Sequence, residues 1–348
     1  MIIFEGIRAL IMFAISFIVA LFLTALFIKL VSRFNLKKVN IRDEKSAPIF
    51  YKFHKQKADT PTMGGIIIWG TVLGLALIFL IFEKFFDGFA DYFNFVNRAE
   101  TYLPLAAMLF AAIVGLIDDL FGILRIGPHG GGLRIYHKLI LYAIVGIIGA
   151  WWFYFKLGFD SLYIPFIGNV YIGYWYLLFF VFIIIATAFS VNETDGLDGL
   201  AGGTMLFSFG SITAVAFILQ RYDLANMGAV LLGSLLAFLW FNIYPARFFM
   251  GDTGSMALGI TLGVMAFLTN TALLLPFFAF IPMVESISVI IQLISKKIFK
   301  RKIFLSTPIH HHFEALGWPE SQITMRFWII SAIASSIGLV IFSLARFI

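Results

Sequence analysis

The chain has 348 residues, of which 61% are hydrophobic and only 13% are charged. A soluble globular domain carries roughly 25% charged residues. This composition therefore excludes a water-soluble globule and predicts a polytopic membrane protein. The sequence contains no cysteine, which excludes disulfides, thiolate metal sites and a cysteine nucleophile. The formal net charge of +6 is less informative than the positions of the charges.

Ten apolar segments are long enough to cross the membrane, because a hydrocarbon core of about 30 Å needs about 20 helical residues. The first segment is too long for a cleavable signal and continues into a basic loop, so we expect it to remain in the mature protein. The expected fold is all-α, with one transmembrane domain over residues 1 to 348. The ten segments are 7 to 32, 62 to 82, 101 to 117, 138 to 155, 174 to 190, 199 to 219, 224 to 243, 253 to 269, 272 to 295 and 326 to 347.

Ten spans would place both termini on one side and divide the loops into two sets. Of the 25 Lys and Arg residues, only Arg8, Lys84, Arg98, Lys156, Arg221 and Arg346 fall on the side of the termini. By the positive-inside rule, the other side is cytoplasmic and both termini lie outside. The five cytoplasmic loops are 33 to 61, 118 to 137, 191 to 198, 244 to 252 and 296 to 325, and they hold all six histidines. Polar chemistry on one face is typical of an enzyme or receptor for a cytosolic ligand.

Two adjacent aspartates, Asp118 and Asp119, end the third segment. Neighbouring helical side chains point about 100° apart, so the two carboxylates are expected to have different partners. One could contact a metal ion or a proton. The alternative is a solvated helix end.

The segment NETDGLDGLAGG follows the fifth span. Asn192, Asp195 and Asp198 recur every three residues, which on a helix would form one polar ridge able to hold a nucleotide or a hydrated cation. Its glycines allow close approach of a ligand or helix. The alternative is a flexible turn, since Asp-Gly pairs commonly form turns.

Asp252 lies just before the eighth span, in a loop that also carries Asn242, Arg247 and Phe249. A carboxylate at this position could be a plain helix cap. It also suits Mg²⁺, which usually combines one or two carboxylates with waters and substrate phosphates.

Three consecutive histidines, His310, His311 and His312, lie in the last cytoplasmic loop. Adjacent imidazoles diverge around the backbone, so they are poorly suited to one tetrahedral zinc ion. Contact with phosphate or pyrophosphate is the favoured interpretation. A pH-sensitive surface cluster is the alternative.

Three further charged residues stand out. Lys57 precedes TPTMGG at the second span, and Lys138 begins the fourth, so each could be a point charge for phosphate. Other basic residues of the first loop suit anionic lipid headgroups. Glu285 lies inside the ninth span, where a carboxylate costs about 2.5 kcal/mol or more on insertion scales. We expect it to face protein or water in a structural role, with a proton or ion pathway as the alternative.

The chain closely resembles the phospho-N-acetylmuramoyl-pentapeptide transferase family of the polyprenyl-phosphate N-acetylhexosamine 1-phosphate transferases. The resemblance runs through TPTMGG, GLIDD, NETDGLDGLAGG, FMGDTGS and PIHHHFEALGWPE, and the last motif is the most discriminating. It implies transfer of phospho-MurNAc-pentapeptide from UDP-MurNAc-pentapeptide to undecaprenyl phosphate, giving lipid I and UMP with Mg²⁺. It also implies a bacterial cytoplasmic-membrane homodimer with ten transmembrane helices, a broken ninth helix, periplasmic termini and an active site built from the five cytoplasmic loops. No nucleic-acid partner is implied.

Position by position, the resemblance implies Asp252 as the Mg²⁺ ligand and Asp118 as the carboxylate that deprotonates or positions the lipid phosphate. The implied catalytic residues are Asp118, Asp119, Asp252, His311 and His312. The implied substrate-binding residues are Lys57, Thr62, Lys138, Asn192, Asp195, Gly196, Leu197, Asp198, Asn242, Phe249 and His310.

Three other functions are compatible with parts of the pattern. A sibling transferase would use UDP-N-acetylglucosamine or a related sugar nucleotide. An ion-coupled secondary transporter is suggested by the ten spans and Glu285. A catalytically inactive scaffold would keep the motifs without turnover.

Overall fold

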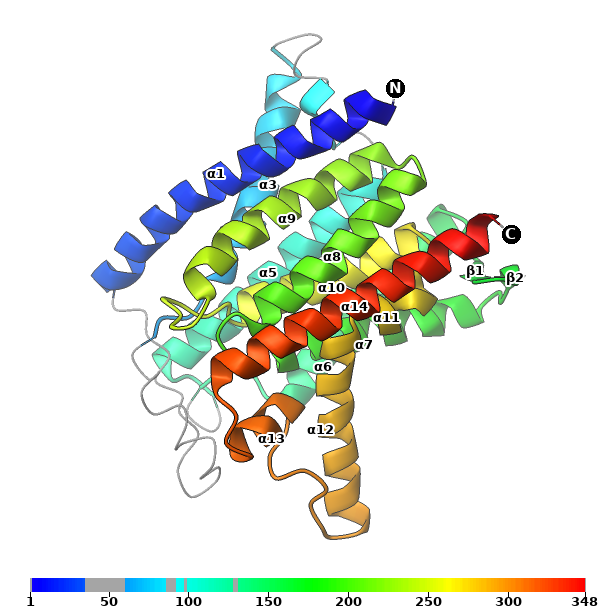
Figure 1. Ribbon diagram of the computed structural model, residues 1–348. Coiled ribbons are helices and arrows are strands. Elements are labelled where there is room, and N and C mark those ends of the chain that lie inside the picture. Colours follow the sequence, from blue (N-terminus) through cyan, green and yellow to red (C-terminus); the bar gives the residue numbers. More distant parts are fainter. Residues whose placement is uncertain (1, 35–59, 86–91, 97–98, 128–130, 348) are drawn as a thin grey trace.

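The computed structural model describes residues 2–34, 60–85, 92–96, 99–127 and 131–347 and shows a bundle of long helices (Figure 1). Every one of the ten predicted segments falls on a helix or on a pair of helices. The helices are α1 (Ile2–Phe34), α3 (Gly65–Phe82), α5 (Ala99–Leu124), α6 (Ile135–Trp151), α7 (Trp175–Thr194), α8 (Leu200–Ile218), α9 (Tyr222–Asn242), α10 (Asp252–Leu268), α11 (Leu275–Phe278), α12 (Phe280–Ile298), α13 (Ile309–Ala315) and α14 (Glu320–Phe347).

The apolar helices confirm a polytopic membrane protein. Within the described residues, eight helices are long and apolar enough to span a membrane, and the bent pair α11 and α12 would make nine. Helix α10 is also apolar but has only 17 residues. Ten spans therefore stay a prediction.

Helix α10 forms the centre of the bundle, because all of its residues from Asp252 to Leu268 are buried. Glycines let neighbouring backbones approach its first turns closely. A Cβ on Gly115 of α5 would lie 2.3 Å from the carbonyl oxygen of Asp252, and one on Gly65 of α3 would lie 2.2 Å from the Cα of Gly254. These contacts bring the ends of α3, α5 and α10 together.

The ninth predicted segment is broken. A short 3₁₀ turn (Ala272–Leu274) leads into α11, and the helix pair is bent by 90° at Ala279. Helix α12 consequently leaves the direction of the bundle (Figure 1). Glu285 on α12 is fully buried, which confirms that this carboxylate faces protein.

The all-α expectation needs one small correction. After α6 and a π-helical turn (Trp152–Lys156), the chain forms a two-stranded antiparallel hairpin, β1 (Ser161–Ile164) and β2 (Gly168–Tyr171), with Ser161 opposite Tyr171. The strands are only four residues long, too short to stand out as an alternating pattern in an aromatic, apolar sequence.

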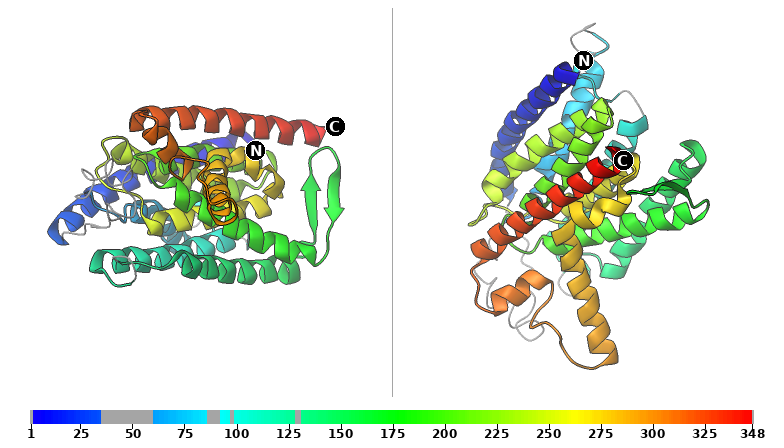
Figure 2. Two further views of the ribbon diagram at one scale, coloured as in Figure 1. Left: turned by 90° about the horizontal axis from the view of Figure 1, so that it is seen from below. Right: turned by 45° about the vertical axis from the view of Figure 1, so that its right-hand side comes forward.

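The two ends of the bundle carry different elements. The start of α1, the end of α14 and the β hairpin lie at one end, and α13 lies at the other (Figures 1 and 2). Both chain ends thus lie on the same side of the bundle. Which face of the membrane that side occupies stays a prediction.

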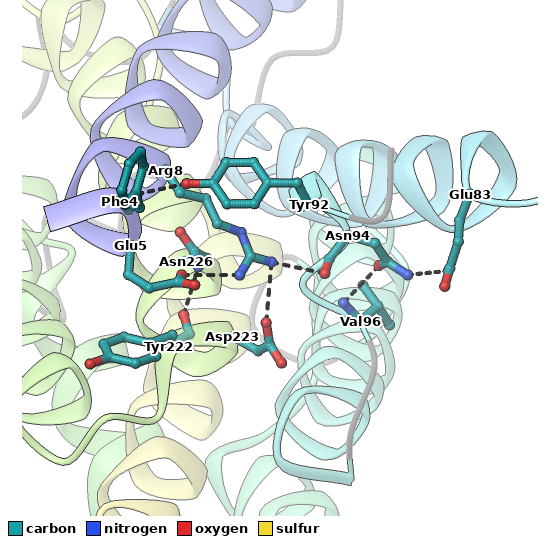
Figure 3. Close-up of polar contacts among 10 residues, drawn as sticks. All are labelled: Phe4, Glu5, Arg8, Glu83, Tyr92, Asn94, Val96, Tyr222, Asp223 and Asn226. Carbon is teal, nitrogen blue, oxygen red and sulfur yellow. Dashed lines mark hydrogen bonds and ion pairs between the residues drawn. The ribbon is translucent and has the colours of Figure 1, made fainter. Parts of the chain in front are cut away.

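A polar cluster around Arg8 joins elements at the end that carries the termini (Figure 3). Arg8 is 6% exposed, and its Nη2 donates to the carbonyl of Asn94 at 2.9 Å and to Asp223 at 3.2 Å. Its Nη1 contacts Glu5 at 3.2 Å. The cluster therefore ties α1 to α9 and to the segment 92–96.

Candidate active site

A lysine bridges two aspartates at the centre of the candidate site. Lys138 Nζ lies 2.7 Å from Asp118 Oδ2 and 2.7 Å from Asp252 Oδ1. Both carboxylates are buried, at 2% and 8% exposure. The three residues come from the end of α5 and from the first turns of α6 and α10. The fold thus brings together three residues that are far apart in the sequence.

Asn192 extends this network from the last turn of α7. Its Nδ2 donates to Asp252 Oδ1 at 2.5 Å and to Ser255 Oγ at 2.9 Å. The N-cap of α10 is Gly251, and Asp252 is the first residue of the helix itself. Asp252 is therefore not the N-cap residue, and its carboxylate contacts Lys138 and Asn192.

Asp118 and Asp119 diverge, as predicted. Asp118 Oδ1 accepts a short hydrogen bond from the backbone N–H of Leu133, while Asp119 Oδ2 accepts from the N–H of Thr253 at 3.0 Å. Asp195 Oδ2 accepts from the N–H of Gly251 at 2.9 Å. Asp119 and Asp195 thus hold the backbone on both sides of Asp252.

The polar ridge predicted from Asn192, Asp195 and Asp198 is wrong. Helix α7 ends at Thr194, and Gly199 adopts a left-handed conformation with φ +74° before α8 begins. Residues 195 to 199 therefore form a turn, the interpretation left as the alternative. The three side chains nevertheless reach one neighbouring segment, residues 246 to 255, through different partners.

The rest of that turn is held from two sides. Asp198 Oδ2 accepts from the N–H of Ala246 at 2.9 Å, and the N–H of Asp198 donates to Glu320 at 2.7 Å. Asn242 accepts from the N–H of Gly199 at 3.1 Å and donates to the carbonyl of Phe248 at 2.8 Å. These bonds fix the end of α9 and the start of α14 against the turn.

The three histidines take three different partners, which confirms that they diverge. His310 Nδ1 lies 2.9 Å from Glu285, His311 Nδ1 lies 2.6 Å from Glu314, and His312 Nδ1 accepts from the N–H of Leu305 at 3.2 Å. His310 and His311 are buried, so the exposed-cluster interpretation does not hold for them. His310 also packs on Gly196, joining α13 to the turn after α7.

The remaining predicted residues are dispersed around this network. Thr62 is buried, and its Oγ1 would lie 2.6 Å from a Cβ on Gly251. Phe249 joins its backbone to that of Pro61 and Gly64, at 2.8 and 2.9 Å. The Leu197 side chain packs in a small apolar cluster rather than among the polar groups. Lys57 lies outside the described residues.

Three residues of the network were missed by sequence reasoning. They are Ser255, which contacts Asn192, Glu314, which contacts His311, and Glu320, which accepts from Asp198. Glu314 stands three residues after His311 on a short helix, a spacing that could have indicated the pair. The contacts of Ser255 and Glu320 join distant segments and carry no local signal.

The donor set of the central network suits a hard cation. Within the described parts of the chain, no three His, Asp or Glu side chains form a preformed metal site. Mg²⁺ does not require one, because it usually takes one or two carboxylates and completes its shell with water and substrate phosphate. Asp252 and Asp118, both within 2.7 Å of one ammonium group, supply such oxygens side by side. The residues therefore fit the expected metal.

Comparison with known proteins gives a consistent result. The model of glycosyl transferase family 4 matches residues 101–270, and phospho-N-acetylmuramoyl-pentapeptide-transferase signature 1 matches residues 57–68. The chain is 35% identical to phospho-N-acetylmuramoyl-pentapeptide-transferase of Chloroflexus aurantiacus, covering 95% of this chain and 89% of the relative. Proteins of the same name from Nautilia profundicola and a Geobacillus species are each 34% identical, covering 95% and 94% of this chain and 93% and 95% of the relatives.

Proposed function

Because the chain belongs to the phospho-N-acetylmuramoyl-pentapeptide transferase family, we propose that it makes lipid I. It transfers phospho-MurNAc-pentapeptide from UDP-MurNAc-pentapeptide to undecaprenyl phosphate and releases UMP, as a step of peptidoglycan biosynthesis. The observation that carries the site assignment is Lys138, whose ammonium joins Asp118 and Asp252 at 2.7 Å each. Phosphoryl transfer depends chiefly on positioning and on neutralising phosphate charge, and this network supplies both.

The site residues take separate roles in this proposal. Asp252, with Asp118 beside it, would hold Mg²⁺, which when bound neutralises pyrophosphate charge and orients the phosphates. Lys138 lies between these carboxylates and is placed to hold the transferred phosphate as a point charge. The turn 195 to 198 and Asn242 form the nucleotide side of the pocket, and His311 and His312 contact phosphate or sugar.

Asp118 is proposed to position the lipid phosphate for direct attack on the donor. Its Oδ1 accepts from the N–H of Leu133 and its Oδ2 lies against Lys138, so both oxygens are engaged. A carboxylate whose two oxygens both have partners is a poor nucleophile. We therefore expect no burst of UMP when undecaprenyl phosphate is omitted. A stoichiometric burst would instead indicate a covalent intermediate on the enzyme.

The membrane arrangement is part of the proposal. The enzyme would span the bacterial cytoplasmic membrane ten times as a homodimer, with both termini periplasmic and the site facing the cytoplasm. The excess of basic residues in the five loops that the sequence predicts to be cytoplasmic supports this orientation. Accessibility labelling from either side of the membrane tests it. Labels at both termini from the cytoplasmic side would contradict it.

A donor assay tests the function itself. Purified protein with Mg²⁺ and undecaprenyl phosphate should release UMP from UDP-MurNAc-pentapeptide and not from UDP-N-acetylglucosamine. Exclusive use of the second donor would identify a sibling transferase. Asp252→Ala should eliminate turnover in folded protein, and Mg²⁺ removal should do the same in the unaltered enzyme. A transporter, in contrast, would show uptake into proteoliposomes that Glu285→Gln abolishes.

A further inference from the structure

A buried carboxylate contacts a buried histidine behind the turn that follows α7. Glu285 and His310 are both fully buried, and Glu285 Oε2 lies 2.9 Å from His310 Nδ1. The backbone N–H of His310 also donates to the same oxygen, at 3.4 Å. The residues are 25 positions apart and belong to α12 and α13.

The contact decides which way the imidazole points. An oxygen that accepts from the backbone N–H is also placed to accept from Nδ1–H, which assigns the ring proton to Nδ1. The opposite nitrogen, Nε2, then faces the turn after α7. A Cβ on Gly196 would lie only 2.2 Å from Nε2, so the ring rests directly on the backbone of that glycine. Gly196 belongs to the turn that the proposed function assigns to the nucleotide.

The break in the ninth segment makes this contact possible. The bend of 90° at Ala279 turns α12 away from the bundle, and Glu285 follows within the next two turns. His311 is different, because its partner Glu314 lies on the same short helix and would move with it. Glu285 instead ties α13 to a separate element and so fixes α13 against the turn.

We infer that Glu285 is a positioning residue for nucleotide-sugar binding. Its carboxylate holds His310 with Nδ1 protonated and Nε2 directed at the Gly196 backbone, which fixes the turn 195 to 198 that receives the UDP portion of the donor. The inference rests on the proposed function. It adds a residue that none of the matched motifs contains, acting through His310 rather than on the substrate.

A double-mutant cycle tests this inference through the KM for UDP-MurNAc-pentapeptide, measured by UMP release. Outer-shell partners of metal-ligating histidines typically contribute 10–100-fold to affinity or activity, and by analogy Glu285→Gln should raise this KM about 10-fold. His310→Asn keeps an N–H near the position of Nδ1 and removes Nε2, and it should raise KM at least as much. Because Glu285 acts through His310, adding Glu285→Gln to His310→Asn should cause no further rise.

Ser288→Ala is the matched control, since Ser288 is buried on the same helix and, among the described residues, its hydroxyl donates within that helix to the carbonyl of Glu285. Because the Ser288 hydroxyl does not contact His310, this variant should change KM by less than about 2-fold. A merely structural role of Glu285 would lower the active fraction, and hence kcat, without changing KM. That result, or multiplication of the two effects in the double variant, would overturn the inference.

A replacement variant and a parallel assay of the unaltered enzyme complete the test. If Glu285→Gln does not fold, Glu285→Asp replaces it, because it retains the carboxylate one methylene short of His310. The unaltered enzyme is assayed in parallel. Its failure to release UMP from UDP-MurNAc-pentapeptide would reject the proposed function, whereas normal release with independent effects at Glu285 and His310 would reject this inference alone.

Discussion

Replacing Lys138 by methionine should remove the ion pairs that join Asp118 and Asp252. The substitution keeps most of the side-chain volume and removes the ammonium that lies 2.7 Å from both Asp118 and Asp252. Both carboxylates are nearly fully buried, and removing one partner of a buried ion pair costs about 3–5 kcal/mol. We therefore expect a lower thermal unfolding temperature in detergent and loss of UMP release.

Added Mg²⁺ provides a second readout for the same variant. A cation that binds the folded state at 100 times its Kd stabilises it by about 2.7 kcal/mol. With no ammonium competing for Asp118 and Asp252, Mg²⁺ should raise the unfolding temperature of Lys138→Met more than that of the unaltered protein. Turnover should not return, because the charge on the transferred phosphate is still missing.

Lys156→Met is the matched control. Lys156 is exposed at the far end of the same helical segment, over the ring of Trp151 at 5.7 Å, and it contacts no carboxylate among the described residues. Exposed charges contribute about 0–1 kcal/mol, so this variant should resemble the unaltered protein. Equal stability and turnover of the two methionine variants would refute the assignment of Lys138 as the bridge.

Two further predictions separate the site from the scaffold. Gly251→Ala should cost about 1–3 kcal/mol of stability through backbone strain at φ +75°. It should also abolish turnover, since the new Cβ would lie 2.5 Å from Asp119 Oδ2. Gly158→Ala is the control: its φ is +72° but nothing lies within 4 Å of the new Cβ, so it should lose stability and keep turnover. Arg8→Met should destabilise the protein by at most about 3 kcal/mol, the lower end for a buried pair, because its partners Glu5 and Asp223 are 18% and 20% exposed. Turnover per folded molecule should be unchanged, because the start of α1 lies at the opposite end of the bundle from α13. Thermal unfolding measures the stability of these variants, and UMP release measures their turnover. A stable but inactive Arg8→Met would contradict the prediction for Arg8.

Helix positions could be predicted from the sequence because apolar runs are a local signal. The segment expected at 174 to 190 is the helix Trp175–Thr194, and the one expected at 253 to 269 is Asp252–Leu268. The divergence of Asp118 from Asp119, and of the three histidines, was also predictable, since it follows from the geometry of adjacent side chains. The candidate residues themselves were identified by motif, and all but Lys57 lie in the described structure.

The partners of these residues could not be predicted, because they depend on tertiary contacts. Lys138 reaches Asp252 across 114 positions, and Asp198 reaches Glu320 across 122. The turn at 195 to 199 shows the same limit. Its three-residue spacing favoured a helix, yet α7 ends at Thr194, His310 packs on Gly196, and Gly199 adopts a left-handed conformation. Neither the His310 contact nor the conformation of Gly199 can be predicted from residue spacing.

Several carboxylates converge on the first turn of α10 through different contacts. Asp119 binds the N–H of Thr253 and Asp195 binds the N–H of Gly251, so the backbone is held on each side of Asp252. The orientation of Asp252 is then set by neighbouring residues rather than by its own side chain, which is left to contact Lys138 and Asn192. Preorganisation of this kind lowers the reorganisation needed when charge shifts during phosphoryl transfer. It also follows that loss of Asp119 or Asp195 should displace Asp252 and reduce turnover without removing any group that meets the phosphate.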